Sequence, residues 1–80
     1  MKARVYITLK QGVLDPQGQA IEGALERLAI AGVNSVRQGK IFDIDLSATD
    51  ATRAHALLDD ACRRLLANTV IEDYEISLIQ

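Results

Sequence analysis

The 80-residue sequence is poor in the side chains that disulfides, metal sites and aromatic stacking need. It has one Cys, one His, no Trp, two Tyr and one Phe. A single Cys excludes an internal disulfide, so we expect a reducing, cytoplasmic environment. The lone His55 has no partner at ligand spacing, which favours a residue at the boundary of a core over a metal ligand. Neither a metal nor a cofactor is expected in this chain.

Excess positive charge and long apolar runs are missing as well. The net charge is −2 at pH 7, with a pI of about 5.2. We therefore expect no binding to nucleic acid or to an anionic membrane surface. No apolar run approaches the ~20 residues of a membrane span. The 80 residues predict a single domain, 1–80, whose core is thin enough for a second subunit to add needed stability.

The patterns that are present predict two helices and four strands. Apolar residues alternate over residues 3–9 and 74–79, as in half-buried strands, and they follow helical spacing over 21–28 and from about 51 to 67. The stretch "VNSVRQGKIFDIDL", residues 33–46, predicts a hairpin with Gln38-Gly39 as a two-residue turn. The order β-α-β-β-α-β is the ferredoxin-like α+β arrangement. We expect a four-stranded antiparallel sheet with both helices on one face and the other face open.

The stretch "GVLDPQGQA", residues 12–20, raises the question of a phosphate-binding loop. A Walker-type loop needs Lys and Ser or Thr after its second Gly, whereas Gly18 is followed by Gln19 and Ala20. Asp15 is instead a favourable N-cap, and Pro16 suits the first position of a helix. This stretch predicts a helix start.

The remaining reactive side chains do not converge. The apolar stripe of the second helix is predicted to consist of Ala54, Leu58, Ala61, Cys62 and Leu65. Cys62 lies about 10 Å along the axis from His55, too far for that imidazole to activate a thiolate. Asp43 and Asp45 share one strand face and could hold a hard cation, but outward-facing polar alternation explains them better. The chain alone is not predicted to be an enzyme, and no catalytic, cofactor-binding or metal residue is assigned.

Two sets of residues are candidates for contacts with partners. Strand parity places Tyr6, Val36, Ile41 and Ile79 on the open face, where we expect them to be buried in a homo-oligomer. At the expected hairpin tip, Arg37, Gln38, Gly39 and Lys40 present two cations. They are either ordinary solvated loop charge or a docking site for a partner subunit.

Three stretches together resemble a known family. "LKQGVLDPQGQAIEGAL", "VRQGKIFDIDL" and "LLANTVIEDYEI" are similar to PurS, the small subunit of formylglycinamidine ribonucleotide synthetase in purine biosynthesis. The resemblance covers nearly the whole chain in the same order. One departure is Thr69, where the family usually has Pro, which alters the stiffness of a turn.

The resemblance implies an adaptor role. In this family the synthetase subunit PurL uses ATP and Mg to activate the substrate amide, the glutaminase subunit PurQ releases ammonia, and PurS, usually a dimer and possibly a tetramer, bridges the two. From the residues alone, an alternative stays open: a ligand-sensing regulatory dimer of the amino-acid-binding ferredoxin-like type, whose sites are built from backbone and ordinary polar groups.

Overall fold

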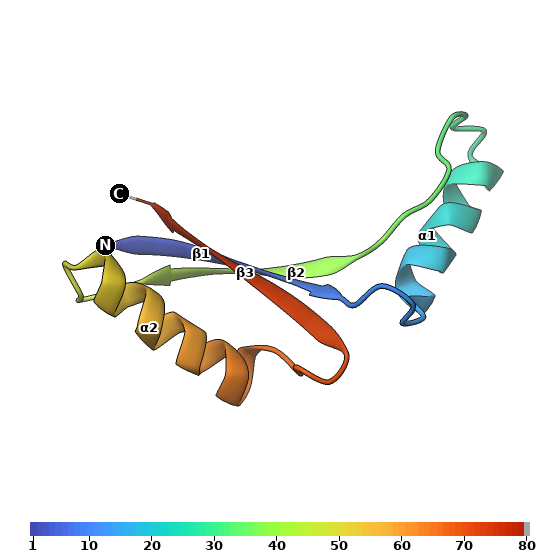
Figure 1. Cartoon of the computed structure of the whole chain (residues 1–80). Helices are drawn as coiled ribbons and strands as arrows, with labels where there is room; N and C mark the ends of the chain where they lie inside the picture. Colours follow the sequence, from blue (N-terminus) through green and yellow to red (C-terminus); the bar gives the residue numbers. More distant parts are fainter. Residues whose placement is uncertain (80) are drawn as a thin grey trace.

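The computed structural model describes residues 1–79, which form an α+β fold. Along the chain the elements are β1 (Lys2–Leu9), α1 (Pro16–Arg27), β2 (Gly39–Asp45), α2 (Ala51–Ala61), the π-helical turn η1 (Cys62–Leu66) and β3 (Glu72–Ile79). Figure 1 shows them in an elongated molecule, with α1 at one end and the N-terminus near the other.

The sheet has three strands in the order β2-β1-β3, and both pairs are antiparallel. The sheet lacks one of the four expected strands, so the prediction of four strands is wrong. The missing strand is residues 33–37, which run as an extended segment without a strand partner. The predicted turn at Gln38-Gly39 is wrong too, because the chain continues nearly straight through it into β2.

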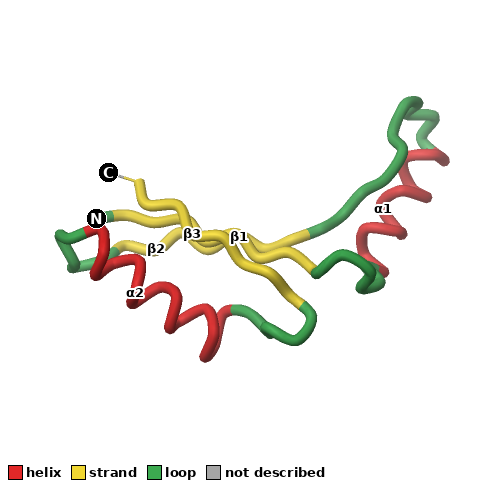
Figure 2. Tube along the Cα trace, in the orientation of Figure 1, coloured by secondary structure: helices red, strands yellow, loops and turns green. Residues whose placement is uncertain are grey.

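Residues 10–38 form an arm that projects beyond the end of the sheet (Figures 1 and 2). Thr8 of β1 pairs with Gly39 of β2, so the chain leaves and re-enters the sheet at the same end. No substantial contact joins α1 to a strand of the described chain, and the molecule measures 48 × 27 × 14 Å. The prediction that both helices cover the sheet is therefore wrong for α1.

The core lies between α2 and the face of β1 that carries Ala3, Val5 and Ile7, all of which are buried. From the helical side, Leu58 and Cys62 complete it. The prediction that Cys62 is a buried hydrophobe is confirmed. Because α2 packs mainly against β3, Phe42 and Ile44 of β2 stay only half-buried.

Leu65 departs from the predicted stripe of the second helix and is 82% exposed. The helix widens after Ala61 into η1, where the Ala67 N–H donates to the Cys62 carbonyl over five residues at 2.9 Å. This wider turn rotates the chain, so that Leu65 points to solvent and Leu66 is half-buried in its place. None of the helices in residues 1–79 is long and apolar enough to cross a membrane.

The core predicts opposite outcomes for two neighbouring leucines of α2. Leu58 is 1% exposed and Leu57 is 53% exposed. Replacing Leu58 with Ala should lower the free energy of unfolding by about 2–5 kcal/mol, because it removes packed methyl groups and leaves a cavity. The matched change Leu57→Ala should cost less than about 1 kcal/mol. Urea denaturation followed by circular dichroism measures both, and equal losses would contradict this packing.

Candidate functional site

The base of the arm is organised around the carboxylate of Asp15. Asp15 is 6% exposed and is the one charged residue buried within residues 1–79. Its Oδ1 accepts a hydrogen bond from the Gly18 N–H at 3.0 Å, and its Oδ2 accepts one from the Gln38 N–H at 2.7 Å. The first bond and Pro16 at the start of α1 confirm the predicted helix start. The second bond ties that helix start to the segment that leads into β2.

Two further side chains join the arm's outgoing and returning segments. Arg37 donates from Nη1 to the Val13 carbonyl at 2.9 Å and from Nη2 to the Lys10 carbonyl at 3.2 Å. Glu22 of α1 accepts the Val36 N–H through Oε1 at 2.6 Å. We call Asp15, Glu22 and Arg37 together the latch. Their bonds connect side chains to backbone groups, so they fix where the two segments lie relative to each other.

The hydrogen bonds keep Asp15 charged. The pKa of its carboxyl lies below the ordinary value, chiefly because the Gln38 N–H and then the Gly18 N–H stabilise the carboxylate, and the positive charge of Arg37 adds to this. Burial acts in the opposite direction and is outweighed. At neutral pH the latch therefore holds an anion that accepts two backbone hydrogen bonds.

The four residues predicted to dock a partner lie where the arm meets the sheet rather than at a hairpin tip. Gly39 packs closely on β1, because a Cβ there would lie 2.6 Å from the Ile7 carbonyl oxygen. Lys40 lies on the α2 side of the sheet, with its Nζ 3.5 Å from Oε2 of Glu72. Arg37 and Gln38 take part in the bonds described above. A role of these four residues in partner contact stays a prediction.

Of the four residues predicted for the oligomer interface, three share the open face. Tyr6 pairs with Ile41 in the register of β1 and β2, and Ile79 pairs with Lys2 on the same face. All three side chains are exposed, Ile41 most of all at 59%. The placement of Val36 there is wrong, because residues 33–37 form no strand and its N–H is bound by Glu22 of α1. Whether another subunit covers the face stays a prediction.

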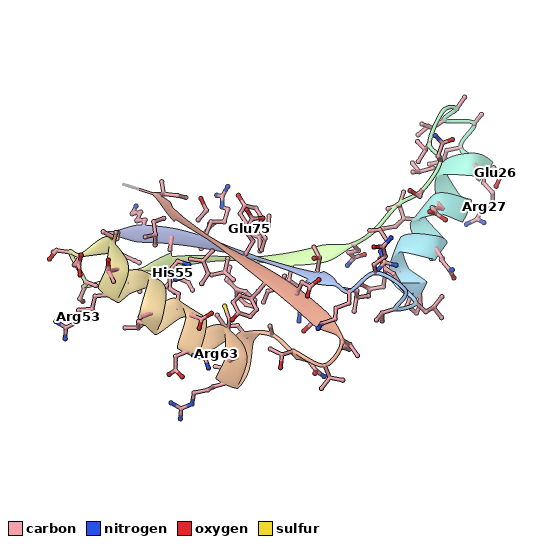
Figure 3. The ribbon with its side chains drawn as sticks, in the orientation of Figure 1. Glu26, Arg27, Arg53, His55, Arg63 and Glu75 are labelled. Carbon is pink, nitrogen blue, oxygen red and sulfur yellow. The ribbon has the colours of Figure 1, made fainter. Side chains whose placement is uncertain are left out.

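A short ion pair lies on the open face. The Arg4 Nε donates to Asp43 Oδ1 at 2.7 Å, and this bond lowers the pKa of the Asp43 carboxyl. The ion pair uses the carboxylate that a cation at Asp43 and Asp45 would need. Within residues 1–79 no group of three or more His, Cys, Asp or Glu side chains is placed to hold a metal ion. Glu75 projects from β3 on the side away from α2 (Figure 3).

The groups around Cys62 form a structural cluster. The Tyr74 hydroxyl donates to Asp59, which lowers the pKa of Asp59 and raises that of Tyr74. Burial, and then the nearby charge of Asp59, raise the pKa of the Cys62 thiol. A protonated, buried thiol is a poor nucleophile. His55 is exposed on α2, near the end of the helix opposite Arg63 (Figure 3).

Three features of the site were not predicted from the sequence: the second hydrogen bond of Asp15, the role of Glu22 and the reason for Gly18. A Cβ at Gly18 would lie 2.5 Å from both Asp15 Oδ2 and the Val36 carbonyl oxygen. The signal was available, because Gly is unfavourable inside a helix unless another chain segment approaches closely. The pairing of Asp15 with Gln38 had no comparable local signal.

Comparisons with known proteins agree on one family. The family model described as "PurS: Phosphoribosylformylglycinamidine (FGAM) synthase" matches residues 2–80. A phosphoribosylformylglycinamidine synthase subunit PurS from Synechocystis is 48% identical over 71 residues, which cover 89% of this chain and 71% of that protein.

Solved structures give the same result. The crystal structure of Methanocaldococcus jannaschii PurS, described as a subunit of formylglycinamide ribonucleotide amidotransferase, is 41% identical, with a TM-score of 0.87 over 95% of this chain and 92% of that one. A chain in the structure of PurLQS from Thermotoga maritima is 29% identical, with a TM-score of 0.90 over 98% of this chain and 95% of that one.

The two glycines of α1 provide a test of the latch. Gly18→Ala should lower the free energy of unfolding by about 1–3 kcal/mol, because the new methyl group collides with Asp15 and with Val36. At Gly23 the nearest atom to an added Cβ is the end of the Arg27 side chain, at 3.5 Å. Gly23→Ala should be neutral or stabilising by up to about 1 kcal/mol, since it improves helix propensity. Thermal unfolding would contradict the close approach if both variants behaved alike.

Proposed function

The chain belongs to the PurS family of phosphoribosylformylglycinamidine synthase, and on this premise we propose that it is the non-catalytic adaptor of that synthase. It bridges the glutaminase subunit PurQ and the synthetase subunit PurL, so that ammonia released from glutamine reaches formylglycinamide ribonucleotide. The observation that carries the proposal is the likeness, over 98% of the chain, to a chain of the Thermotoga maritima PurLQS structure.

The proposal assigns the chemistry to the partners. ATP and Mg act in the synthetase subunit, glutamine is hydrolysed in the glutaminase subunit, and this chain binds no cofactor. Its cytoplasmic location, and the expectation that it binds neither nucleic acid nor a membrane, belong to the same proposal. The family membership favours this function over the regulatory amino-acid sensor.

The shape of the molecule supports an adaptor. An adaptor needs separate surfaces for separate partners, and this chain has a projecting arm, an open sheet face and an exposed tip at η1 (Figure 1). The positively charged residues Arg37 and Lys40, with Gln38 and Gly39, lie where the arm meets the sheet and are our candidates for partner docking. Holding two enzymes in one relative position assists transfer between their sites without any reaction on the adaptor.

Omission of the chain tests the division of labour. Synthesis from glutamine by the synthetase and glutaminase subunits should be lost without this chain, whereas synthesis from added ammonium should survive in part, because the synthetase keeps its own active site. Product formation with each nitrogen source measures both. Equal loss with glutamine and with ammonium would show that the chain acts in the synthetase reaction itself.

We also propose that two copies exchange their arms. The outer edge of β2 lacks the strand that residues 33–37 would supply in a ferredoxin-like fold, and Phe42 and Ile44 beside it are only half covered. The arm meanwhile carries apolar side chains that its own chain leaves exposed: Leu14, Ile21, Leu28, Ile30 and Val33. The arm of a second copy supplies both a strand and a helix for the vacant half of the sheet.

The open face offers a second, separate contact between copies. Tyr6, Ile41 and Ile79 lie on the face of the sheet opposite α2, whereas the helix of an exchanged arm covers the α2 side, so arm exchange leaves them uncovered. Packing of two open faces would join two dimers into a tetramer. These two surfaces together would account for both a dimer and a tetramer.

Ile41→Glu separates the two contacts. A carboxylate at this exposed position of the open face should block packing of dimers and leave arm exchange intact, so the variant should sediment as a dimer. The control Val70→Glu places the same charge at an exposed residue of the turn before β3 and should sediment like the unsubstituted protein. Analytical ultracentrifugation at micromolar concentration decides, and a monomer for the unsubstituted protein would contradict both contacts.

A further inference from the structure

Two charged side chains lie at the ends of the two helices, far apart within one chain. Arg27 is the last residue of α1, and Asp50 is the N-cap residue of α2, where its side chain makes no capping hydrogen bond. Both are exposed, and neither joins an ion pair within residues 1–79. Figure 3 places Arg27 at one end of the molecule and Arg53, in the first turn of α2, at the other. The two charges therefore do not meet within one chain.

The hydrogen bonds of the latch indicate which edge of residues 33–37 pairs with a second copy. Two carboxylates of the latch accept the N–H groups of Val36 and Gln38. In an extended chain alternate N–H groups point to the same edge, so these two bonds occupy one edge of the segment. The N–H groups of Ser35 and Arg37 point to the opposite edge. In arm exchange this opposite edge is the one that pairs with β2 of the second copy.

The same bonds indicate which side of α1 faces α2 of the second copy. Glu22 binds the returning segment from the edge that stays outside, so its side of α1 is turned away from α2. At 3.6 residues per turn, Ala20, Ala24 and Arg27 lie on the opposite side of the helix. Ile21 lies between the two sides, and it is exposed in one chain, so it is free to pack on the sheet of the second copy. The side that carries Arg27 is then turned to α2.

Asp50 lies on the side of α2 that faces the vacant half of the sheet. On the other side of this helix, Asp59 accepts the Tyr74 hydroxyl of β3, and β3 lies across β1 from β2. Helical spacing places Asp50 and the half-buried Ala61 on the side toward β2. An exchanged α1 therefore lies against the side of α2 that carries Asp50.

The directions of the chain bring the two charged ends together. α2 follows β2 and runs back along the sheet, so it is antiparallel to β2. α1 is antiparallel to residues 33–37 of its own arm, and these residues are antiparallel to the β2 that they join in a ferredoxin-like sheet. An exchanged α1 is therefore antiparallel to α2, and its last turn lies beside the first turn of α2.

We propose that Arg27 of one copy forms an ion pair with Asp50 of the other, where the exchanged α1 packs beside α2. This inference rests on the proposed exchange of arms, and it names a polar contact that selects a second copy of this chain. Each charge also suits its own helix, because a cation at the end of α1 and an anion at the start of α2 interact favourably with the helix dipoles. Every dimer contains two such pairs, one for each arm.

Charge reversal in separate chains tests the ion pair. Arg27→Asp and Asp50→Arg each place like charges at both contacts of a homodimer, so each should raise the dimer Kd roughly tenfold in analytical ultracentrifugation. A mixed dimer of the two variants has opposite charges at both contacts. A tenfold penalty on each homodimer leaves about twenty mixed dimers for each homodimer of either kind, so roughly nine-tenths of all dimers should be mixed instead of about half.

The mixed dimers are counted after the two variants are unfolded and refolded together. All chains carry Ile41→Glu, so that the open faces do not associate, and native mass spectrometry separates the three dimers by mass. The matched control mixes Glu26→Arg with Arg63→Asp. These changes alter the charge of the same two helices by the same amounts, but both side chains are turned away from the contact. The control should give mixed dimers at about the random half.

Mixed dimers at the random proportion in both mixtures would overturn the ion pair and leave the exchange of arms in place. If one reversed variant does not fold, the chain that carries both Arg27→Asp and Asp50→Arg should recover the Kd that the other variant loses, and no recovery would contradict the pair. A monomer for Ile41→Glu alone would show that arms are not exchanged, which removes the pair as well. No measurement includes the synthetase or the glutaminase subunit, so failure of the adaptor function would leave these results unchanged.

Discussion

The carboxylate of Asp15 accepts hydrogen bonds from Gly18 and Gln38, and the shape of the molecule depends on these two bonds. One holds the first turn of α1, and the other attaches that turn to the chain about to enter β2. A buried carboxylate is stable only when donors replace the water it has lost, so the two backbone N–H groups must stay in place. Gly18 leaves room for this arrangement because it has no side chain. The arm is thus built from a local sequence signal and from contacts between distant residues.

Much of the sheet and core could be predicted from the sequence. The alternation of Ala3, Val5 and Ile7 identified the buried face of β1, and the spacing of Ala54, Leu58 and Cys62 identified the buried face of α2. The cap at Asp15 followed from residue preferences at helix starts. These features are set by neighbours a few residues apart, and periodicity records them directly.

The errors concern features that local pattern does not determine. Residues 33–37 alternate like a strand, but a strand needs a partner, and within one chain none is placed beside them. Gln38-Gly39 has the residue types of a turn, but Gly39 instead allows the backbone of β2 to lie close to the Ile7 carbonyl oxygen of β1. Leu65 follows helical spacing and is turned outward by the π-helical geometry of η1. In the candidate site, Glu22 and Arg37 bind backbone groups of distant residues. Because nearly every residue type carries the same backbone groups, the sequence does not indicate which residue supplies such a partner.

The pairing of β1 with β3 has a consequence for the order in which the chain acquires structure. β3 is the last element of the described chain, and it pairs with β1, the first, along its length from Leu9 with Glu72 to Lys2 with Ile79. During synthesis the central strand β1 therefore emerges long before its neighbour β3 exists, with the apolar residues Val5 and Ile7 uncovered. Such non-local pairing slows folding and prolongs the exposure of unpaired strand edges. The nascent chain is most vulnerable to aggregation in the interval before β3 leaves the ribosome.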